Sequence, residues 1–393
     1  MRLAVSLASD RVCAGAMVTR LALTDFRGYG AARLTLEPRP VVLTGPNGAG
    51  KTNLLEAVSF LAPGRGLRRA RLGEVDRRVP PARATALPPG AWACAATIAG
   101  PRGATEIGTG RDAASPGERR LVQIDGTAAR TQAALAAHLC VIWLTPQMDR
   151  LFTEAAAARR RFLDRLVYGF DPAHAHRVGA YEQAMRDRAR LLADDRPADP
   201  AWLGALEGRM AEHGVAVAAA RRDTVARLDE ACAETRGAFP AARLALDGEI
   251  ETWLETLPAL GAEEEFARRL AAARRADAAA GTTALGPHRA DLAVRHGGTH
   301  MSASQCSTGE QKALLIGIVL AFARLLAARR GEVPILLLDE VAAHLDALRR
   351  DALFEAIAAA RGQAWLTGTD RGLFDGMEGV AQFLTVADAV ISR

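Results

Sequence analysis

A glycine-rich turn between an apolar run and a helical pattern holds the residues whose types and spacing could do chemistry. Residues 45–52 fit the G-x-x-x-x-G-K-[ST] phosphate loop. Glycines let backbone N–H groups approach a phosphate, and the start of the following helix adds a partial positive charge. Lys51 would reach the β- and γ-phosphates, and the Thr52 hydroxyl would hold Mg²⁺. The expected ATP-binding residues are Gly45, Pro46, Asn47, Gly48, Ala49, Gly50, Lys51, Thr52 and Asn53.

Lysine is rare in this chain. Lysine and arginine together number 50, but Lys51 and Lys312 are the only two lysines. A bias toward arginine that spares Lys51 indicates that a compact ammonium group is needed there, because a planar guanidinium is not equivalent.

A second apolar run ends in two acids. Residues 334–338 are typical of a buried strand, and Asp339 and Glu340 follow directly. In a phosphate-loop ATPase the first acid binds Mg²⁺ and the second polarises the attacking water. Lys51, Asp339 and Glu340 are therefore the candidate catalytic residues, and Thr52 and Asp339 the candidate metal ligands. The alternative is an acidic turn at a strand end that has no catalytic role.

Composition limits the class of protein. With 393 residues, 49% hydrophobic and 24% charged, the chain is typical of a soluble globular protein of two or three domains, or one with a large insertion. A net charge of +5 is compatible with nucleic acid. Five scattered cysteines without a C-x-x-C pair indicate reduced thiols in a cytoplasmic protein and argue against a zinc site. The longest apolar stretch, residues 313–323, is shorter than the about 18 residues of a membrane span, so we expect no membrane partner. Residues 1–16 are expected to be a disordered extension, or Met17 to be the true start.

Strands dominate both ends of the chain. The strands expected before residue 150 are 18–23, 32–36, 41–44, 92–99, 105–110, 121–124 and 141–144. Strands and helices then alternate toward the C-terminus, an order that indicates a parallel sheet. The elements expected there are strands Thr282–Leu285, Asp291–Arg295, 334–338, 363–367 and 382–386 and helices 309–329 and 346–360. We therefore expect an α/β head with a mixed sheet, made of residues 17–150 and 282–393.

Helical spacing dominates the middle of the chain. Residues 151–281 are rich in Ala, Arg, Leu and Glu and form the expected helical lobe. Leu203, Leu206, Met210 and Val217 fall at helical steps. This pattern predicts a helix–helix hairpin with a short coiled-coil seam, and an ordinary helical bundle is the alternative.

A small-residue turn before a very apolar helix is a second candidate anion site. Residues 307–312 read Ser-Thr-Gly-Glu-Gln-Lys, with Ser307 as the candidate N-cap. The turn begins 32 residues before Asp339 (339 − 307) and resembles the signature motif of ABC-type ATPases, and residues 341–346 resemble their D-loop. The resemblance implies an ABC-type ATPase head. It makes Ser307, Gly309 and Glu310 candidate nucleotide-binding residues.

In the ABC superfamily the signature motif completes the nucleotide site of a second subunit. The resemblance therefore implies a head-to-tail homodimer with two ATP molecules at its interface. The γ-phosphate supplies charge that Ser307, Gly309 and the helix end of the partner would bind. ADP lacks that phosphate, so hydrolysis would release the dimer.

The spacing of the motifs indicates one branch of the superfamily. Lys51 and Ser307 are 256 residues apart (307 − 51), more than transporter subunits need. Several stretches resemble the RecF family of bacterial recombination mediators, and the resemblance runs from Met17 to the end. They are residues 23–29, 45–53, 159–164, 286–292, 338–340, 343–346 and 367–370. The elements at 161–164 (Arg-Phe-Leu-Asp) and 286–289 (Gly-Pro-His-Arg) are the most branch-specific.

The RecF resemblance implies a specific activity. RecF proteins are slow, DNA-stimulated ATPases that dimerise on ATP and favour gapped DNA or junctions of single and double strands. They work with RecO and RecR to place RecA on DNA in repair and the SOS response, which implies a cytoplasmic, nucleoid-associated protein. Gln147 is the candidate lid glutamine that senses Mg²⁺ and the γ-phosphate. Thr369 stands where transporter ATPases have a switch histidine.

Arginine clusters are the candidate DNA contacts, because they neutralise phosphates without reading sequence. The alternative is a solvated arginine face in an arginine-biased chain. The candidates are Arg65, Arg68, Arg69, Arg71, Arg77, Arg78, Arg159, Arg160, Arg161 and Arg289. His288 has no partner ligands at metal spacing, so we expect a structural or DNA-facing role for it.

Three other functions are alternatives to the RecF hypothesis. A transporter-coupled ATPase lacks the expected short spacing, and a nuclease-linked SMC-like protein would need a further cluster of acids. An SMC-like module that binds DNA with little turnover is the third alternative, and the intact Lys51, Asp339 and Glu340 weigh against it.

Overall fold

Two six-stranded sheets and a two-stranded one, with their helices, make up the part of the chain that the computed structural model describes. That part comprises residues 15–77, 90–101, 103–112, 119–194 and 199–393. The N-terminal extension expected at residues 1–16 falls, up to residue 14, outside the described residues, and so does Arg78.

A mostly parallel sheet carries the phosphate loop. Its strand order is β14-β13-β3-β12-β11-β8, and only β14 runs antiparallel to its neighbour. The strands are β3 (Val41–Thr44), β8 (Val141–Leu144), β11 (Ile335–Leu338), β12 (Ala364–Gly368), β13 (Gln382–Ala387) and β14 (Val390–Ser392). The register pairs Thr44 with Gly368 and Leu144 with Leu338, so four parallel strands end at one edge. Open α/β sheets bind ligands at this carboxyl edge.

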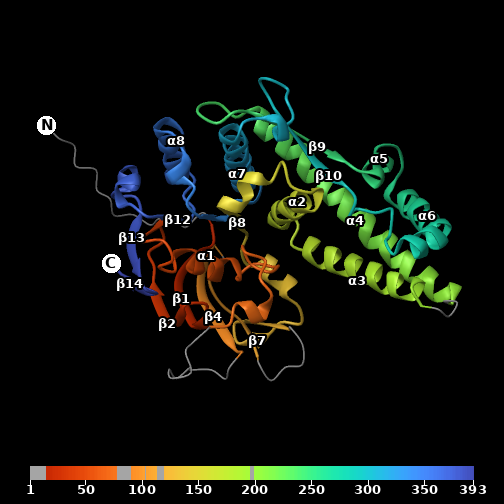
Figure 1. Cartoon of the computed structure of the whole chain (residues 1–393), viewed down its shortest axis with the longest axis horizontal. Coiled ribbons are helices and arrows are strands. Elements are labelled where there is room, and N and C mark those ends of the chain that lie inside the picture. The colour runs from red at the N-terminus through yellow and green to blue at the C-terminus, as the bar shows by residue number, and fades with distance from the viewer. Residues whose placement is uncertain (1–14, 78–89, 102, 113–118, 195–198) are drawn as a thin grey trace.

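Successive side chains of the buried strands point to opposite faces of the parallel sheet and belong to two separate hydrophobic cores. Val42 and Leu336 belong to one cluster and Val41 and Leu337 to the other, because successive side chains point to opposite faces. One face is covered by α7 and α8 and the other by α1 and the second sheet (Figure 1). These helices are α1 (Lys51–Ser59), α7 (Thr308–Arg330) and α8 (Ala347–Ala359). Burial on both faces explains the continuous apolar runs in the sequence.

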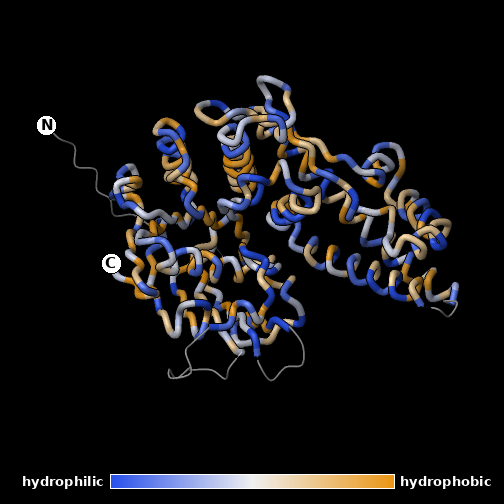
Figure 2. Tube along the Cα trace, viewed as in Figure 1, coloured by the Kyte–Doolittle hydropathy of each residue, from blue (hydrophilic) through white to orange (hydrophobic). Residues whose placement is uncertain are grey.

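Helix α7 is the central helix of the head. Among the described residues it is the one helix long and apolar enough to cross a membrane by length and composition, and 78% of its apolar window is buried inside the protein. Figure 2 shows the apolar colour along this helix, where it stands on the parallel sheet. The burial is that of a core helix packed between the sheet and the helical lobe.

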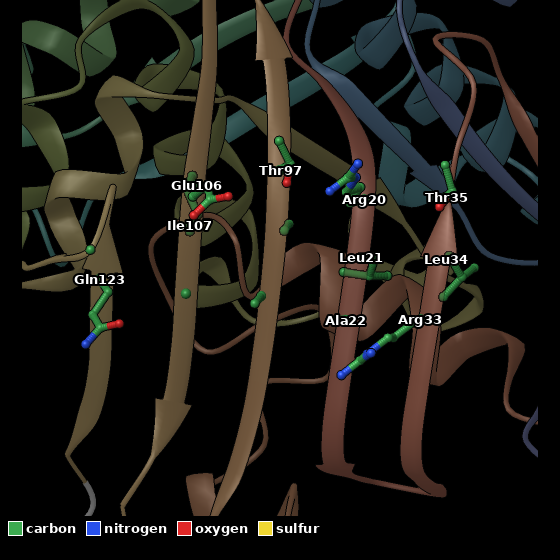
Figure 3. A pocket seen from close by; sticks show the side chains of 14 residues that line it. Arg20, Leu21, Ala22, Arg33, Leu34, Thr35, Thr97, Glu106, Ile107 and Gln123 are labelled. Atoms are coloured by element: carbon green, nitrogen blue, oxygen red, sulfur yellow. The ribbon is translucent and has the colours of Figure 1, made fainter.

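The second sheet is antiparallel, with the order β2-β1-β4-β5-β6-β7. Its strands are β1 (Met17–Phe26), β2 (Tyr29–Thr35), β4 (Trp92–Gly100), β5 (Gly103–Arg111), β6 (Arg120–Ile124) and β7 (Thr127–Ala128). Leu21 and Ile107 face the core, whereas Arg20, Arg33 and Gln123 lie on the outer face, which has a hollow of about 480 Å³ (Figure 3). No residue of the phosphate loop lines this hollow, so it is separate from the candidate site.

The helical lobe is built around one long helix. Its helices are α2 (Ala156–Phe170), α3 (His174–Leu192), α4 (Pro200–Ala233), α5 (Glu249–Thr256) and α6 (Ala259–Ala280). Helix α4 has 34 residues, about 51 Å at 1.5 Å per residue. It packs against both α3 and α6, and Leu203, Leu206, Met210 and Val217 are buried. The expected hairpin of α3 and α4 is present, and its seam belongs to a bundle that includes α6.

One predicted strand in this region was wrong, and one strand was missed. The segment Thr282–Leu285 is not a strand, because the Thr283 carbonyl accepts hydrogen bonds from the side chains of His288 and Arg289. A strand that was not expected, β9 (Ala242–Asp247), pairs with β10 (Asp291–His296). The apolar and polar residues of β9 alternate, but the helical composition on either side concealed that short pattern.

Candidate nucleotide site

The phosphate loop has the backbone that its glycines allow. Gly45 has a φ of 145°, and a Cβ there would collide with the carbonyl oxygen of Val386. Gly50 has a φ of 111°, and a Cβ there would lie 2.7 Å from the Tyr29 hydroxyl oxygen. The Tyr29 hydroxyl donates to the Gly50 carbonyl at 3.1 Å, which fixes the residue before helix α1. The loop therefore leads directly from β3 into the helix N-terminus.

Lys51 is held against its own loop. The Nζ atom donates to the carbonyls of Gly45 (2.6 Å) and Pro46 (2.9 Å), and the side chain is buried. Burial lowers the pKa of Lys51, and the charges of Glu340 and Asp339 oppose that shift. The ammonium therefore lies in the field of both acids, inside the loop that would hold the phosphates.

Asp339 joins three elements at the carboxyl edge of the sheet. The Thr52 hydroxyl donates to Asp339 at 2.9 Å, and the Thr367 hydroxyl donates to the same carboxylate at 2.8 Å. Burial raises the pKa of Asp339, although these two hydrogen bonds oppose the shift. A hydroxyl and a carboxylate are oxygen ligands that suit Mg²⁺, and a cation would favour the charged carboxylate, so the residues present fit that ion.

Glu340 has a strained backbone next to Asp339. Its φ is 54°, a left-handed conformation that is uncommon for residues other than glycine. Its N–H donates to the Thr367 hydroxyl at 2.9 Å, which holds the residue in place. Strain of this kind is typical of functional sites. Thr367 thus positions both acids, whereas Thr369, at the switch position, is exposed.

A hollow of about 560 Å³ opens beside the phosphate-loop helix. It is lined by Arg27, Gly28, Asn53, Arg68, Glu74 and Asp76. Arg27 and Arg68 both pair with buried Glu56, at 2.7 and 2.8 Å, and Arg68 also donates to Asn53 at 2.6 Å. The structure therefore places Arg68, a candidate DNA contact, beside the phosphate loop.

The turn that holds Gln147 is tied to the signature helix. Gln147 lies in the 3₁₀ turn Pro146–Arg150, directly after β8, and is exposed. Asp149 in the same turn pairs with Lys312 of α7 at 3.3 Å, and the lysine is only 8% exposed. One ion pair thus connects the candidate lid to the helix that begins at Ser307.

The signature turn is exposed, and a capping box closes the N-terminus of helix α7 there. Ser307 accepts a hydrogen bond from the Glu310 N–H at 3.3 Å, while its own N–H donates to the Glu310 carboxylate at 2.9 Å. The Ser307 N–H and the Ser307 hydroxyl both donate to the Glu310 carboxylate and hold its pKa below the usual range. Ser307 and Gly309 are exposed, and a Cβ at Gly309 would meet nothing within 4 Å. Within the described ranges, no hydrogen bond or ion pair joins residues 307–310 to the phosphate loop.

The candidate DNA-binding arginines divide into engaged and free side chains. Arg159 pairs with Asp291 at 2.7 Å, Arg160 donates to the Ala290 carbonyl, and Arg289 donates to the Thr283 carbonyl. Arg77 pairs with Asp25 at 3.2 Å, and Arg71 is exposed. Among described residues, the side chains that make no hydrogen bond or ion pair include Arg65, Arg69 and Arg161.

Comparison with known proteins identifies the family. A family model for the RecF/RecN/SMC N-terminal domain matches residues 17–392. The DNA replication and repair protein RecF of Rhizobium rhizogenes is 50% identical over 378 residues, which cover 96% of this chain and 98% of that protein. The chain belongs to the RecF family. The RecF protein of Agrobacterium fabrum is 49% identical, with coverage of 95% and 98%.

Solved structures agree on the fold. The structure of the recombination mediator protein RecF-ATP in the RecFOR pathway matches with a TM-score of 0.79 at 18% identity, covering 96% of this chain and 99% of that one. An Smc head domain from Pyrococcus furiosus matches with a TM-score of 0.53 at 15% identity, covering 96% and 95%. The expected α/β head of the ABC type, with a helical lobe, is confirmed.

The two branch-specific RecF elements meet in a buried network. Asp164 accepts two hydrogen bonds from Arg221, at 2.7 and 2.8 Å, and one from His174 at 2.8 Å. Arg221 also donates to the Pro287 carbonyl at 2.6 Å. Burial alone would raise the pKa of Asp164, but Arg221 and His174 hold it well below its usual range. The network joins α2 and α4 to the loop before β10.

His288 fills a structural position in this RecF chain. Its Nε2–H donates to the Thr283 carbonyl at 2.9 Å, so Nδ1 accepts from the Tyr181 hydroxyl at 2.7 Å. Both bonds use the neutral imidazole. Burial lowers the pKa of His288, and Arg289, Arg160 and Arg221 add to the shift, although the hydrogen bond to Thr283 opposes it.

The lowered pKa of His288 predicts an acid-sensitive contribution to stability. Below about pH 6.5 the unfolded chain takes up a proton that the folded chain resists, so stability falls as the pH drops. His288→Gln should remove this contribution, which is at most about 1.4 kcal/mol per pH unit. Urea unfolding of both proteins between pH 5 and 7 measures the difference. The prediction fails if the free energy of unfolding changes with pH equally in the original chain and in His288→Gln. It also fails if replacing exposed His176 by glutamine reduces the pH dependence by the same amount.

Sequence reasoning missed the residues that support the candidate nucleotide site. Thr367 lies in a stretch that resembles the family, but nothing in its spacing revealed that it would hold Asp339 and Glu340. Lys312 had a signal, because it is one of only two lysines in an arginine-rich chain. A compact ammonium suits its narrow, buried position facing Asp149.

Replacing Lys312 by glutamine should loosen the turn that holds Gln147. The change removes a largely buried ion pair worth about 1–2 kcal/mol, so local opening of residues 146–150 should become roughly tenfold more frequent. Hydrogen exchange of these backbone amides measures the opening. Arg329→Gln, at an exposed position of the same helix, is the control. Equal exchange in both variants would show that the pair does not hold the turn.

Proposed function

We propose that this chain is an ATP-dependent, DNA-binding recombination mediator of the RecF type. ATP would draw two copies into a dimer that clamps DNA at gaps or junctions of single and double strands. With RecO and RecR it would promote RecA loading in DNA repair and the SOS response, and slow hydrolysis would release it. The observation that carries the proposal is the Thr52–Asp339 contact beside Glu340, in a chain half identical to curated RecF proteins.

The nucleotide site supports ATP rather than a general anion. Loop N–H groups and Lys51 can bind the phosphates, and the hollow at Arg27 and Asn53 has room for the rest of a nucleotide. Thr52 and Asp339 would hold Mg²⁺, and Gln147 is the third candidate contact. Bound there, Mg²⁺ would neutralise charge on the phosphate oxygens. Glu340 is then placed to orient water and accept its proton.

The exposed signature turn supports action on a second copy. Ser307 and Gly309 present a helix start with unfilled space in front of it, and neither is bonded to the phosphate loop of its own chain within the described residues. A γ-phosphate on the partner would supply the missing anion. The pair of Lys312 with Asp149 would then link the signature turn of one site to the lid of the other.

Nucleotide-dependent DNA binding tests the proposal. Fluorescence anisotropy with a labelled gapped duplex and a blunt duplex should show tighter binding with ATP than with ADP, and a preference for the gap. The Lys51→Ala variant should bind each DNA with the same affinity in ATP as in ADP, because it cannot hold the phosphates of the nucleotide. If ATP changes nothing in the original chain, the chain is a binding module without an ATP-driven cycle.

A further inference from the structure

A basic cavity lies between the head and the helical lobe. Its volume is about 460 Å³, and it is lined by residues from the loop after α1, from the turn after β8 and from α2. Arg69, Arg161 and Arg165 come together there, and we call these three the arginine pocket. No residue of 45–53 lines it, so it is distinct from the phosphate loop.

The positive charge of the arginine pocket is poorly compensated. In the part of the chain that the structure describes, Arg69 and Arg161 form no ion pair or hydrogen bond. Arg165 donates, among the described residues, only to the Trp143 carbonyl at 3.5 Å, and its guanidinium lies 3.4 Å from the centre of the Trp143 ring. Exposed Glu154 is the acid at the rim. Three guanidinium groups thus share one acid that is open to solvent.

Two further features indicate that the pocket is built for an anion. Burial lowers the pKa of Arg165 to about 9, and Arg161 and Arg69 contribute to the shift, so the charges repel one another. Arg69 has a φ of 56°, a conformation that costs a non-glycine residue roughly 1 kcal/mol or more. A bound anion would relieve the repulsion and offset the strain.

We propose that the arginine pocket binds a backbone phosphate of DNA. The proposal rests on the DNA binding proposed above and gives it a site. Guanidinium forks match phosphate oxygens in geometry, and contacts to phosphate carry no sequence information. Phosphate contact is therefore independent of sequence, as a protein that acts at gaps requires.

Two of the residues that line the arginine pocket connect it to the nucleotide site. Gln147 lines it, and so does Arg68, which bonds to Asn53 of the phosphate loop. A phosphate bound by Arg69 would lie beside Arg68, its neighbour in the sequence, and beside the turn that holds Gln147. DNA binding and the response to ATP are thereby coupled over directly connected residues.

The salt dependence of DNA affinity tests the pocket. The double variant Arg69→Gln/Arg161→Gln is compared with Arg209→Gln/Arg236→Gln, which removes the same charge from exposed positions outside it. With a labelled gapped duplex and ATP, the pocket variant should bind about tenfold more weakly than the control. Its slope of log affinity against log salt should be shallower by about 0.9. Arg161→Lys should bind more tightly than Arg161→Gln, because the charge returns.

The outcomes separate the two proposals. Equal affinity and equal salt slope in the pocket variant and its control overturn the pocket while DNA binding stands. No DNA binding by the original chain overturns both. A thermal unfolding midpoint like that of the control shows that the pocket variant is folded, and Arg161→Lys tests the pocket with the charge retained.

Discussion

Replacing Glu340 by glutamine is expected to reduce ATP hydrolysis by about 10²–10⁴-fold. The amide keeps the shape of the carboxylate but cannot accept the proton of the attacking water. Glu340 follows Asp339 directly, and its N–H is held by Thr367, so the substitution should leave the phosphate loop and the Thr52–Asp339 contact in place. Release of phosphate, measured with and without gapped DNA, gives the effect.

The control for this prediction is Glu378→Gln. Glu378 is exposed and pairs with Arg371 at 3.8 Å, far from the phosphate loop in the sequence, so its replacement should leave the rate unchanged. If Glu340→Gln hydrolyses ATP at the original rate, another group activates the water. If it fails to bind a fluorescent ATP analogue, the rate is lost through ATP binding and not through the missing proton acceptor.

Arg221→Met is expected to destabilise the protein by about 3–5 kcal/mol. Arg221 is 4% exposed and Asp164 10%, so the substitution leaves a carboxylate in the interior with His174 as its remaining partner among the described residues. It also removes the donor to the Pro287 carbonyl, which ties the loop before β10 to α4. The midpoint of urea unfolding measures the loss.

The matched control for Arg221 is an exposed ion pair of the same lobe. Arg186 and Glu182 are 55% and 53% exposed and 3.6 Å apart, so Arg186→Met should cost less than about 1 kcal/mol. Equal losses in the two variants would mean that burial of the network contributes little. The Arg-Phe-Leu-Asp and Gly-Pro-His-Arg elements would then need another explanation than mutual support.

The sequence predicted those elements whose structure depends on residues close together in the chain. The phosphate loop and the strand before Asp339 were found from spacing alone, because glycine turns and continuous apolar runs have few alternative structures. The strand β9 was missed, since its partner β10 is 44 residues later and supplies the surface that makes it a strand. The one local sign of this pairing is the short alternation of β9, which the helical composition on either side concealed.

The candidate site shows the same division. Sequence placed Thr52, Asp339 and Glu340 in one site because each belongs to a motif. It could not show that Thr367 bridges the two acids, or that Arg159 pairs with Asp291, because those contacts depend on tertiary structure. Arginine clusters look alike in a sequence, and the fold is needed to separate Arg159, which pairs with Asp291, from Arg161, which has no ion pair among the described residues.

We propose that the signature turn of one chain completes the nucleotide site of another. Light scattering of Glu340→Gln with ATP, with ADP and without nucleotide tests it most directly. We expect a doubled molar mass with ATP and not with ADP, a larger dimer fraction when gapped DNA is added, and no dimer when Ser307→Arg is added to the same protein. A monomer under every condition, or a dimer that Ser307→Arg does not affect, would contradict a nucleotide site shared between two chains.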